Sequence, residues 1–323
     1  MALPPRLCLA ALDCASASVR ASAISCYSRR VGRSLSPARP RMKLRLSTAA
    51  TPTATPGPDS GPVAVRMPPA PSSLWLADLR ARVGKCIGFG CSTAQVAQAS
   101  AVLRALATEW RGLMAGNEGF LTGGRRGLSD QKVVWGEMDS FGHVNNVTYY
   151  RYAESARVNW ITNFAVHEDP ANRDRWTELM TPRSTGLIMK SLKADFKFPM
   201  VYPDTISVYH KLRHPPDTGS ERGGETPAPS SLVLDCIVIS HQHRRVAARL
   251  EEDIVVYDYQ AARKTAMPPF VRDMLAKTWT AQLRETARAR ERTWELVRAV
   301  ERLERGTWDR KGAMEAWGSA AAA

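Results

Sequence analysis

The spacing of apolar residues predicts two amphipathic helices in the first part of the chain. Apolar residues recur at intervals of three and four, first over residues 74–84 and then from Ser92 to Leu113. Ser92 and Gln95 match a capping box, in which each residue bonds the backbone of the other at a helix start. The apolar stripes must pack on something, so residues 74–121 are expected to form an N-terminal helical extension of the main domain.

The pattern then changes to that of strands interrupted by one long helix. Residues 131–139 are expected to form a strand, and Val147 to Val166 a helix with an apolar face. Four further strands are predicted, over residues 186–198, 204–212, 231–240 and 245–259. Because no helices separate these strands, the pattern favours an α+β fold in which one long helix covers an antiparallel sheet.

Three segments lie outside or interrupt this main domain, which is assigned to residues 131–266. Residues 51–73 are rich in Pro, Ala, Gly and Ser and are predicted to be a disordered linker. A mobile hairpin loop is predicted for residues 214–231, which are also rich in Pro and Gly. Residues 267–310 are expected to form a C-terminal helical extension that packs on the core or on a partner.

The positive charge of the chain is concentrated at its two ends. The 323 residues carry a net charge of +14, with nine Lys or Arg against two acids in residues 1–60, and thirteen against seven in residues 261–312. Residues 1–50 are rich in Arg, Ser and Ala, which is typical of a transit peptide and favours the mitochondrial matrix as the location. The alternative is a disordered basic tail.

Neither a metal site nor a membrane span is expected. The six cysteines include no CxxC pair, and Cys236 in an apolar run is predicted to be a small buried side chain. His241 and His243 favour surface positions over metal ligation, because no carboxylate or thiol lies close in sequence. No segment has the roughly 18 apolar residues that a membrane helix requires. No metal or other cofactor is therefore expected.

The segment WGEMDSFGHVNNVTYYRYAESARV, which begins at Trp135, carries the candidate chemistry. A strand ending at Asp139 and a helix starting near Asn146 must be joined by a tight turn, and Gly142 can adopt the positive φ that such a turn needs. Free backbone N–H groups at a helix start favour negative charge. A carboxylate beside such donors supplies a base or nucleophile and an oxyanion site, which suits thioester hydrolysis. The alternative is a carboxylate that only caps the turn.

This segment, together with ADFKFPMVYPDTISV further along, resembles the acyl-CoA thioesterases of the 4-hydroxybenzoyl-CoA thioesterase type, which have the hotdog fold. The resemblance covers residues 131–259. It implies that Asp139 is the catalytic carboxylate, as nucleophile or as general base, and that the backbone N–H of Asn146 holds the thioester oxygen.

The resemblance implies further roles for five side chains in the same segment. His143 and Glu154 are candidate catalytic residues, although His143 could order the turn and Glu154 could pair with Arg157 or Arg151 on the helix surface. Phe141, Asn145 and Tyr149 are expected to contact the substrate.

The implied substrate is an acyl-CoA or acyl-carrier-protein thioester, and the implied assembly is a homodimer or homotetramer. Lys190, Lys193 and Lys197 alternate on one predicted strand and could supply a basic rim for the phosphates of coenzyme A, or form an ordinary solvated face. Nucleic acid is not an expected partner in this hypothesis. The alternative hypothesis is a non-catalytic hotdog subunit or scaffold of a mitochondrial ribonucleoprotein, with the basic ends as binding arms.

Overall fold

The computed structural model describes residues 67–123, 125–216 and 229–316. The predicted transit peptide lies outside the described residues. So do residues 51–66 of the predicted linker and residues 217–228 of the predicted loop.

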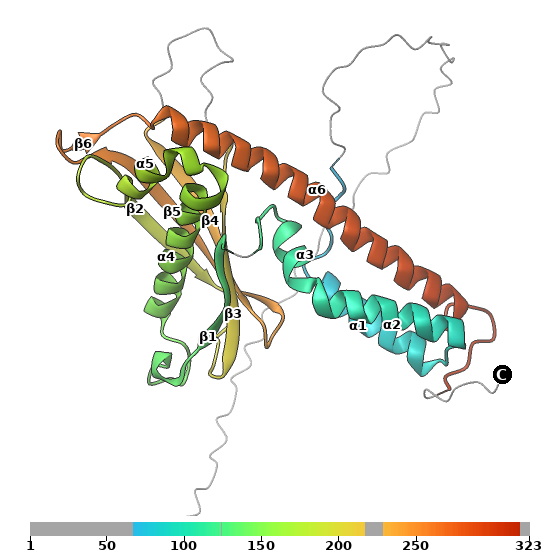
Figure 1. Cartoon of the computed structure of the whole chain (residues 1–323). Coiled ribbons are helices and arrows are strands. Elements are labelled where there is room, and N and C mark those ends of the chain that lie inside the picture. The colour runs from blue at the N-terminus through green and yellow to red at the C-terminus, as the bar shows by residue number, and fades with distance from the viewer. Residues whose placement is uncertain (1–66, 124, 217–228, 317–323) are drawn as a thin grey trace, which may run out of the picture. The chain divides into compact units, whose positions relative to one another are not determined.

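The centre of the fold is an antiparallel sheet whose strands follow the order β1-β3-β4-β5-β2 (Figure 1). Its strands are β1 (Gly127–Val133), β2 (Thr185–Phe196), β3 (Asp204–Leu212), β4 (Ser231–Ser240) and β5 (Arg245–Asp258). A short strand, β6 (Arg263–Lys264), pairs with the end of β5. The antiparallel arrangement predicted from the succession of strands is confirmed.

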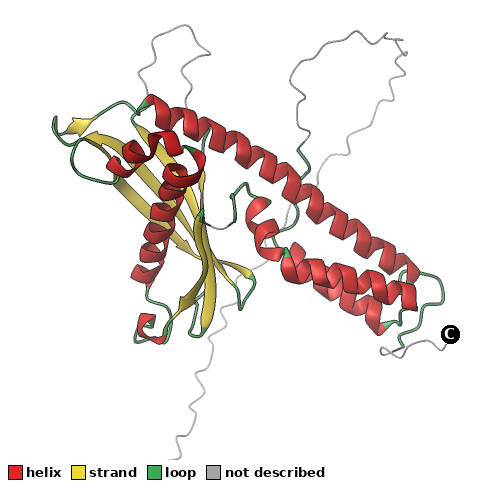
Figure 2. Cartoon of the chain, in the orientation of Figure 1, coloured by secondary structure: helices red, strands yellow, loops and turns green. Residues whose placement is uncertain are grey.

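One long helix, α4 (Asn146–Asn163), lies on one face of this sheet (Figure 2). Its buried side recurs every three or four residues, as predicted, and includes Tyr149, Ala153, Ala156 and Trp160. The chain continues through η2 (Phe164–Glu168), η3 (Pro170–Asn172) and α5 (Arg173–Glu178) before it enters β2. An antiparallel sheet around one long helix, with helical extensions at both ends, is the α+β hotdog fold predicted from the sequence.

The helical extensions lie on the other side of the sheet (Figure 1). They are α1 (Trp75–Gly88), α2 (Thr93–Thr108), α3 (Trp110–Gly116) and α6 (Pro269–Gly306). Here α6 contacts β3, and the shorter helices pack on α6. Their apolar side chains form one core with Tyr209, Ile237 and Ile239, which project from β3 and β4. Strand alternation explains this second core, because neighbouring residues of β3 and β4 point to opposite faces. The extensions therefore pack directly on the sheet.

Two predicted boundaries differ from the structure. The single helix predicted from Ser92 to Leu113 is broken at Glu109, which ends α2 and begins α3. The strand predicted over residues 131–139 ends at Val133, and η1 (Trp135–Glu137) follows it. The Glu137 carboxylate accepts a hydrogen bond from the backbone N–H of Val134 at 2.9 Å, which closes this short helical turn in place of an extended strand.

A buried charged cluster lies between α4 and the sheet. Arg157 Nη1 of α4 is 2.8 Å from Glu252 Oε1, and His210 Nε2 of β3 is 3.2 Å from Glu252 Oε2. The side chains of His210 and Glu252 are fully buried. Burial alone would raise the pKa of Glu252, but its close contact with His210 and the charge of Arg157 outweigh burial and hold that pKa below its ordinary value.

Candidate active site

The turn after η1 is built around the carboxylate of Asp139. Its Oδ1 accepts a hydrogen bond from the Phe141 N–H at 2.8 Å and lies 3.4 Å from the N–H of His143. The backbone N–H of Asp139 donates to His143 O at 2.8 Å, and Gly142 adopts a φ of 73°. Only Oδ1 is occupied by these contacts. Among the described residues, Oδ2 has no hydrogen-bond partner and is available for chemistry.

The first turn of α4 provides a free backbone donor beside this carboxylate. Asn145 is the N-cap of the helix, and its Oδ1 accepts a hydrogen bond from the Val147 N–H at 2.9 Å. The Asn145 N–H donates to Glu137 O at 2.9 Å. Within the described part of the chain, the N–H of Asn146 has no acceptor. This N–H, at the positive end of the helix dipole, is suited to hold an oxyanion.

Asp139 and Asn146 line the same cavity, which has a volume of about 500 Å³ and is called the Asp139 cavity below. Phe141, His143 and Tyr149 line it as well, together with residues 196–199 from the end of β2. Phe141 is 82% exposed, whereas Tyr149 is buried, and this burial raises the pKa of the Tyr149 phenol. The cavity thus combines a carboxylate, a backbone donor and aromatic walls.

Two residues that the sequence did not single out fix the Asp139 turn against α4. The hydroxyl of Tyr152 donates a 2.5 Å hydrogen bond to Oε2 of Glu137, and the carbonyl of Glu137 accepts the Asn145 N–H. Burial, followed by the nearby Glu137 carboxylate, raises the pKa of Tyr152 well above its ordinary value. Tyr152 therefore stays protonated and keeps donating to Glu137.

Two of the predicted site residues do not line the Asp139 cavity. Asn145 caps the helix instead, and Glu154 lies exposed on α4. The surface pair suggested between Glu154 and Arg157 is not formed, because Arg157 turns inward to Glu252. Of the three lysines suggested as a basic rim, Lys197 alone lines this cavity, while Lys190 pairs with Asp253 at 2.5 Å.

The sequence pattern did not predict that residues 196–199 form part of the cavity wall. They lie at the end of β2, which is distant in sequence from Asp139, and the hydrogen bond from the Val144 N–H to Met200 O at 2.9 Å helps to bring the two segments together. The aromatic pair Phe196 and Phe198 beside Pro199 was the available signal. Phe196 packs edge-on against Tyr149, with ring centroids 5.1 Å apart.

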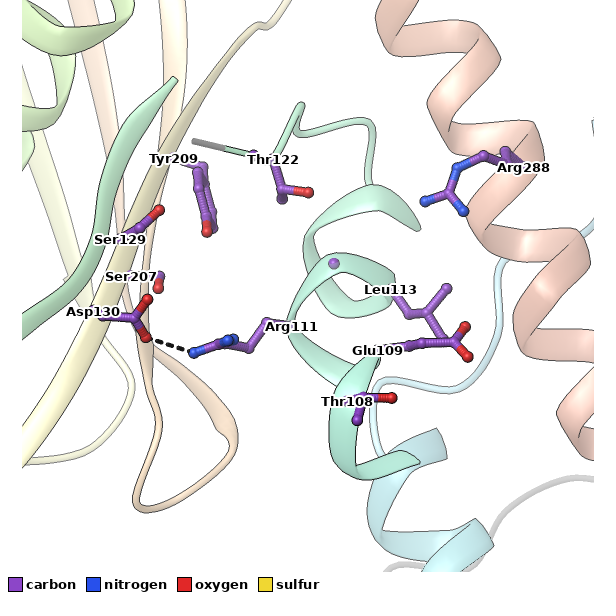
Figure 3. A pocket seen from close by; sticks show the side chains of 12 residues that line it. Thr108, Glu109, Arg111, Leu113, Thr122, Ser129, Asp130, Ser207, Tyr209 and Arg288 are labelled. Carbon is purple, nitrogen blue, oxygen red and sulfur yellow. Dashed lines mark hydrogen bonds and ion pairs between the residues drawn. The ribbon is translucent and has the colours of Figure 1, made fainter. Parts of the chain in front are cut away.

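A different cavity of about 470 Å³ lies between α3 and the outer face of the sheet (Figure 3). Close to it, Ser207 Oγ lies 2.9 Å from His241 Nε2, and Asp130 Oδ1 lies 3.7 Å from His241 Nδ1. The set has the composition of a Ser-His-Asp triad. His241 is only 15% exposed, so its predicted surface position is wrong, whereas His243 is exposed as predicted.

This serine is not prepared for nucleophilic attack. Arg111 Nη1 lies 2.7 Å from Asp130 Oδ1 and 3.3 Å from His241 Nδ1. A guanidinium can only donate, so Nδ1 accepts and the ring proton sits on Nε2, facing Ser207. Burial and then the charge of Arg111 lower the pKa of His241. The cluster therefore fastens α3 to the sheet, as the Arg111–Asp130 contact in Figure 3 shows.

Three further observations concern metal ligands, membrane spans and Cys236. In the described ranges, no group of three or more His, Cys, Asp or Glu residues is arranged to hold a metal ion. None of the helices in the part of the chain covered by the structure is long and apolar enough to cross a bilayer. Cys236 is 1% exposed, as predicted, and burial raises its pKa.

Comparison with known proteins finds one matching family model. A model of the thioesterase-like superfamily matches residues 133–275, which include α4, β2 to β6 and the Asp139 cavity. The match leaves out α1 to α3 and most of α6. No curated protein gives a significant match to the chain. The family match supports thioester hydrolysis as the general activity.

Solved structures similar to this chain include three described as thioesterases. A proposed thioesterase from Pseudomonas aeruginosa is 27% identical, with 46% of this chain and 96% of that one covered and a TM-score of 0.34. The DHNA-CoA thioesterase from Staphylococcus aureus is 12% identical, with 48% of this chain and 88% of that one covered and a TM-score of 0.34. A thioesterase from Thermus thermophilus, complexed with coenzyme A and Zn, is 20% identical, with 46% of this chain and 92% of that one covered and a TM-score of 0.33.

Proposed function

We propose that the protein hydrolyses an acyl-CoA or acyl-carrier-protein thioester to a free acid and a thiol. The observation that carries this proposal is the shared cavity of the Asp139 carboxylate and the free N–H of Asn146. The thioester carbonyl would lie with its oxygen at this N–H and its carbon facing Asp139 Oδ2.

Two routes are chemically balanced at this site. In one, Asp139 removes a proton from water, and the resulting hydroxide adds to the thioester carbon. In the other, Asp139 Oδ2 attacks the carbon itself, and water later hydrolyses the anhydride. In both, the negative charge that develops on the carbonyl oxygen is stabilised by the Asn146 N–H, and the sulfur leaves as a thiolate that takes up a proton.

Assembly as a homodimer or homotetramer is part of the proposal. In the described residues, β2 is an edge strand with no partner on its outer side, and such edges can pair with a second chain. Phe141 and Trp135, which flank the Asp139 turn, are 82% and 75% exposed. Exposed aromatic side chains at a site of this kind suit a subunit boundary. A mitochondrial matrix location is proposed on composition alone.

The experiment that tests the function is a panel of acyl-CoA and acyl-carrier-protein thioesters of different chain length and aromaticity, assayed for thiol release. Turnover of at least one member by the wild-type protein is expected. Co-sedimentation with large particles together with salt-sensitive RNA binding, and no turnover of any member, would favour the ribonucleoprotein scaffold instead.

A further inference from the structure

A basic cavity of about 470 Å³ lies beside the Asp139 cavity and is formed jointly by the sheet and the helical extensions. Residues 70–75 at the start of α1 provide one wall, and Asn117 and Glu118 follow α3 on another. Lys197, Arg245 and Arg249 come from the sheet side, and Arg290 from α6. Four cationic side chains thus line it, against the single carboxylate of Glu118.

Two of these four cationic side chains are not paired with any carboxylate that the structure describes. Arg249 is bound in two-point contact to Glu118, with distances of 2.6 and 2.7 Å, and Lys197 pairs with Asp195 on the exposed surface. Arg245 and Arg290 have no carboxylate within ion-pair distance in the described residues. Arg290 donates instead to the carbonyls of Asn117 and Pro68, which leaves other guanidinium donors free.

The basic cavity is physically linked to the Asp139 cavity. Lys197 lines both of them. The guanidinium of Arg245 stacks 3.9 Å from the ring of Phe198, and Phe198 is part of the Asp139 cavity wall. A ligand that reaches from one cavity into the other would pass Lys197 and the Phe198 ring.

We propose that the basic cavity binds the phosphorylated nucleotide of coenzyme A, that is, the adenosine with its 3′-phosphate and 5′-diphosphate. This inference rests on the proposed function, because it places the thioester end of the same molecule in the Asp139 cavity. The nucleotide carries several phosphate charges and is joined to the thiol by a long flexible arm, which matches two linked cavities of different character. Guanidinium groups with free donors suit phosphate oxygens.

The proposal gives the helical extensions a role in substrate choice. Arg290 and the wall at residues 70–75 lie outside residues 133–275, the part that matches the thioesterase-like family. The sheet side alone would supply only Lys197, Arg245 and Arg249, of which Lys197 and Arg249 already pair with carboxylates. The extensions therefore complete a site that favours coenzyme A over carriers without a nucleotide.

Direct binding of adenosine 3′,5′-bisphosphate to the full-length protein, measured by calorimetry, tests this assignment without any need for hydrolysis. The wild type is expected to bind, and Arg245→Glu should weaken binding at least tenfold. Arg245 is exposed and has no ion pair, so the variant should fold, which its melting temperature checks. Arg263→Glu is the matched control, because it makes the same charge change at an exposed residue that lines neither cavity. A less than twofold effect is expected there.

Two further measurements keep the test decisive. Affinity of the wild type should fall steeply as salt is raised, as expected for phosphate contacts. Arg245→Glu should raise KM for an acyl-CoA about tenfold more than KM for the corresponding acyl-pantetheine, which lacks the nucleotide. An equal rise in KM for both substrates would overturn the proposal. So would no binding of adenosine 3′,5′-bisphosphate by the wild type, or binding of inorganic phosphate with the same affinity as the bisphosphate. Binding of the bisphosphate with no hydrolysis of any thioester would contradict the proposed function alone.

Discussion

The hydroxyl of Tyr152 lies 2.5 Å from Oε2 of Glu137, and this hydrogen bond joins the second turn of α4 to the segment that leads into Asp139. Glu137 also holds the start of the helix through its carbonyl, which accepts the Asn145 N–H. The pair therefore fixes the position of the carboxylate relative to the backbone donor of Asn146, although neither side chain lines the Asp139 cavity.

Tyr152→Phe should lower kcat about tenfold and leave KM nearly unchanged, because a small displacement of a positioned group costs rate more than binding. The free energy of unfolding should fall by about 1 kcal/mol, the usual contribution of one hydrogen bond. Steady-state thiol release and urea unfolding measure the two effects. Tyr150→Phe is the control, since the Tyr150 hydroxyl has no hydrogen-bond partner among the described residues. A kcat loss as large in that control would contradict a positioning role for Tyr152.

Asn146→Pro removes one backbone N–H and little else. Proline is well tolerated at the first position of a helix, and Asn145 before it has φ −56° and ψ 136°, which is compatible with a following proline. Loss of the oxyanion donor should lower kcat by about 100-fold or more with almost unchanged stability. Asn146→Ala keeps the N–H and is the matched control. If both variants lose the same activity, the side chain rather than the backbone is responsible.

Glu252→Gln should destabilise the protein by about 3 kcal/mol, because it leaves Arg157 without its buried counter-charge. Chemical unfolding measures this loss. Glu251→Gln on the same strand is the control, since its pair with Arg213 is 2.7 Å long but half-exposed, and such pairs contribute at most about 1 kcal/mol. An equal loss of unfolding free energy in the two variants would show that the buried cluster stabilises the fold no more than an exposed ion pair does.

The same cluster predicts how stability depends on pH. The pKa of Glu252 is lower in the folded protein than in the unfolded chain, so the unfolded state binds its proton first as the pH falls. The stabilisation is complete above the unfolded pKa and is lost as the pH drops through the folded one. Unfolding free energy should therefore decline below about pH 4.5, with a shallower decline in Glu252→Gln. Parallel curves for the two proteins would contradict this linkage.

Local sequence signals were sufficient to predict most helices and strands, and the part of the candidate site that runs from Asp139 to Asn146. The apolar period identified α4 and its buried face, and the Asp139-to-Asn146 spacing located the carboxylate and the helix start. These features depend on residues close in sequence. The predicted end of the strand before Asp139 was wrong because the Val134 N–H donates to the Glu137 carboxylate and closes a turn there. Strand propensity carries no information about that bond.

The rest of the site depends on contacts between distant segments. Phe198 and Lys197 reach the Asp139 cavity because β2 ends beside the start of α4, and Arg290 reaches the basic cavity because α6 packs along α1 to α3. Glu252 was within reach of sequence reasoning. It occupies an inward position of an alternating strand, between Leu250 and Ile254, and a carboxylate there requires a buried partner.

The most direct test of the central claim is the thiol-release rate of Asp139→Asn on a thioester that the wild type hydrolyses. The asparagine can still accept the Phe141 N–H, so the turn is retained and only the ionised carboxylate is lost. Asp174→Asn, at an exposed position on α5, is the control and should match the wild type. The account predicts a fall in kcat of roughly 100- to 10,000-fold for Asp139→Asn with an unchanged melting temperature. Full activity of this variant on every substrate of the wild type would contradict it.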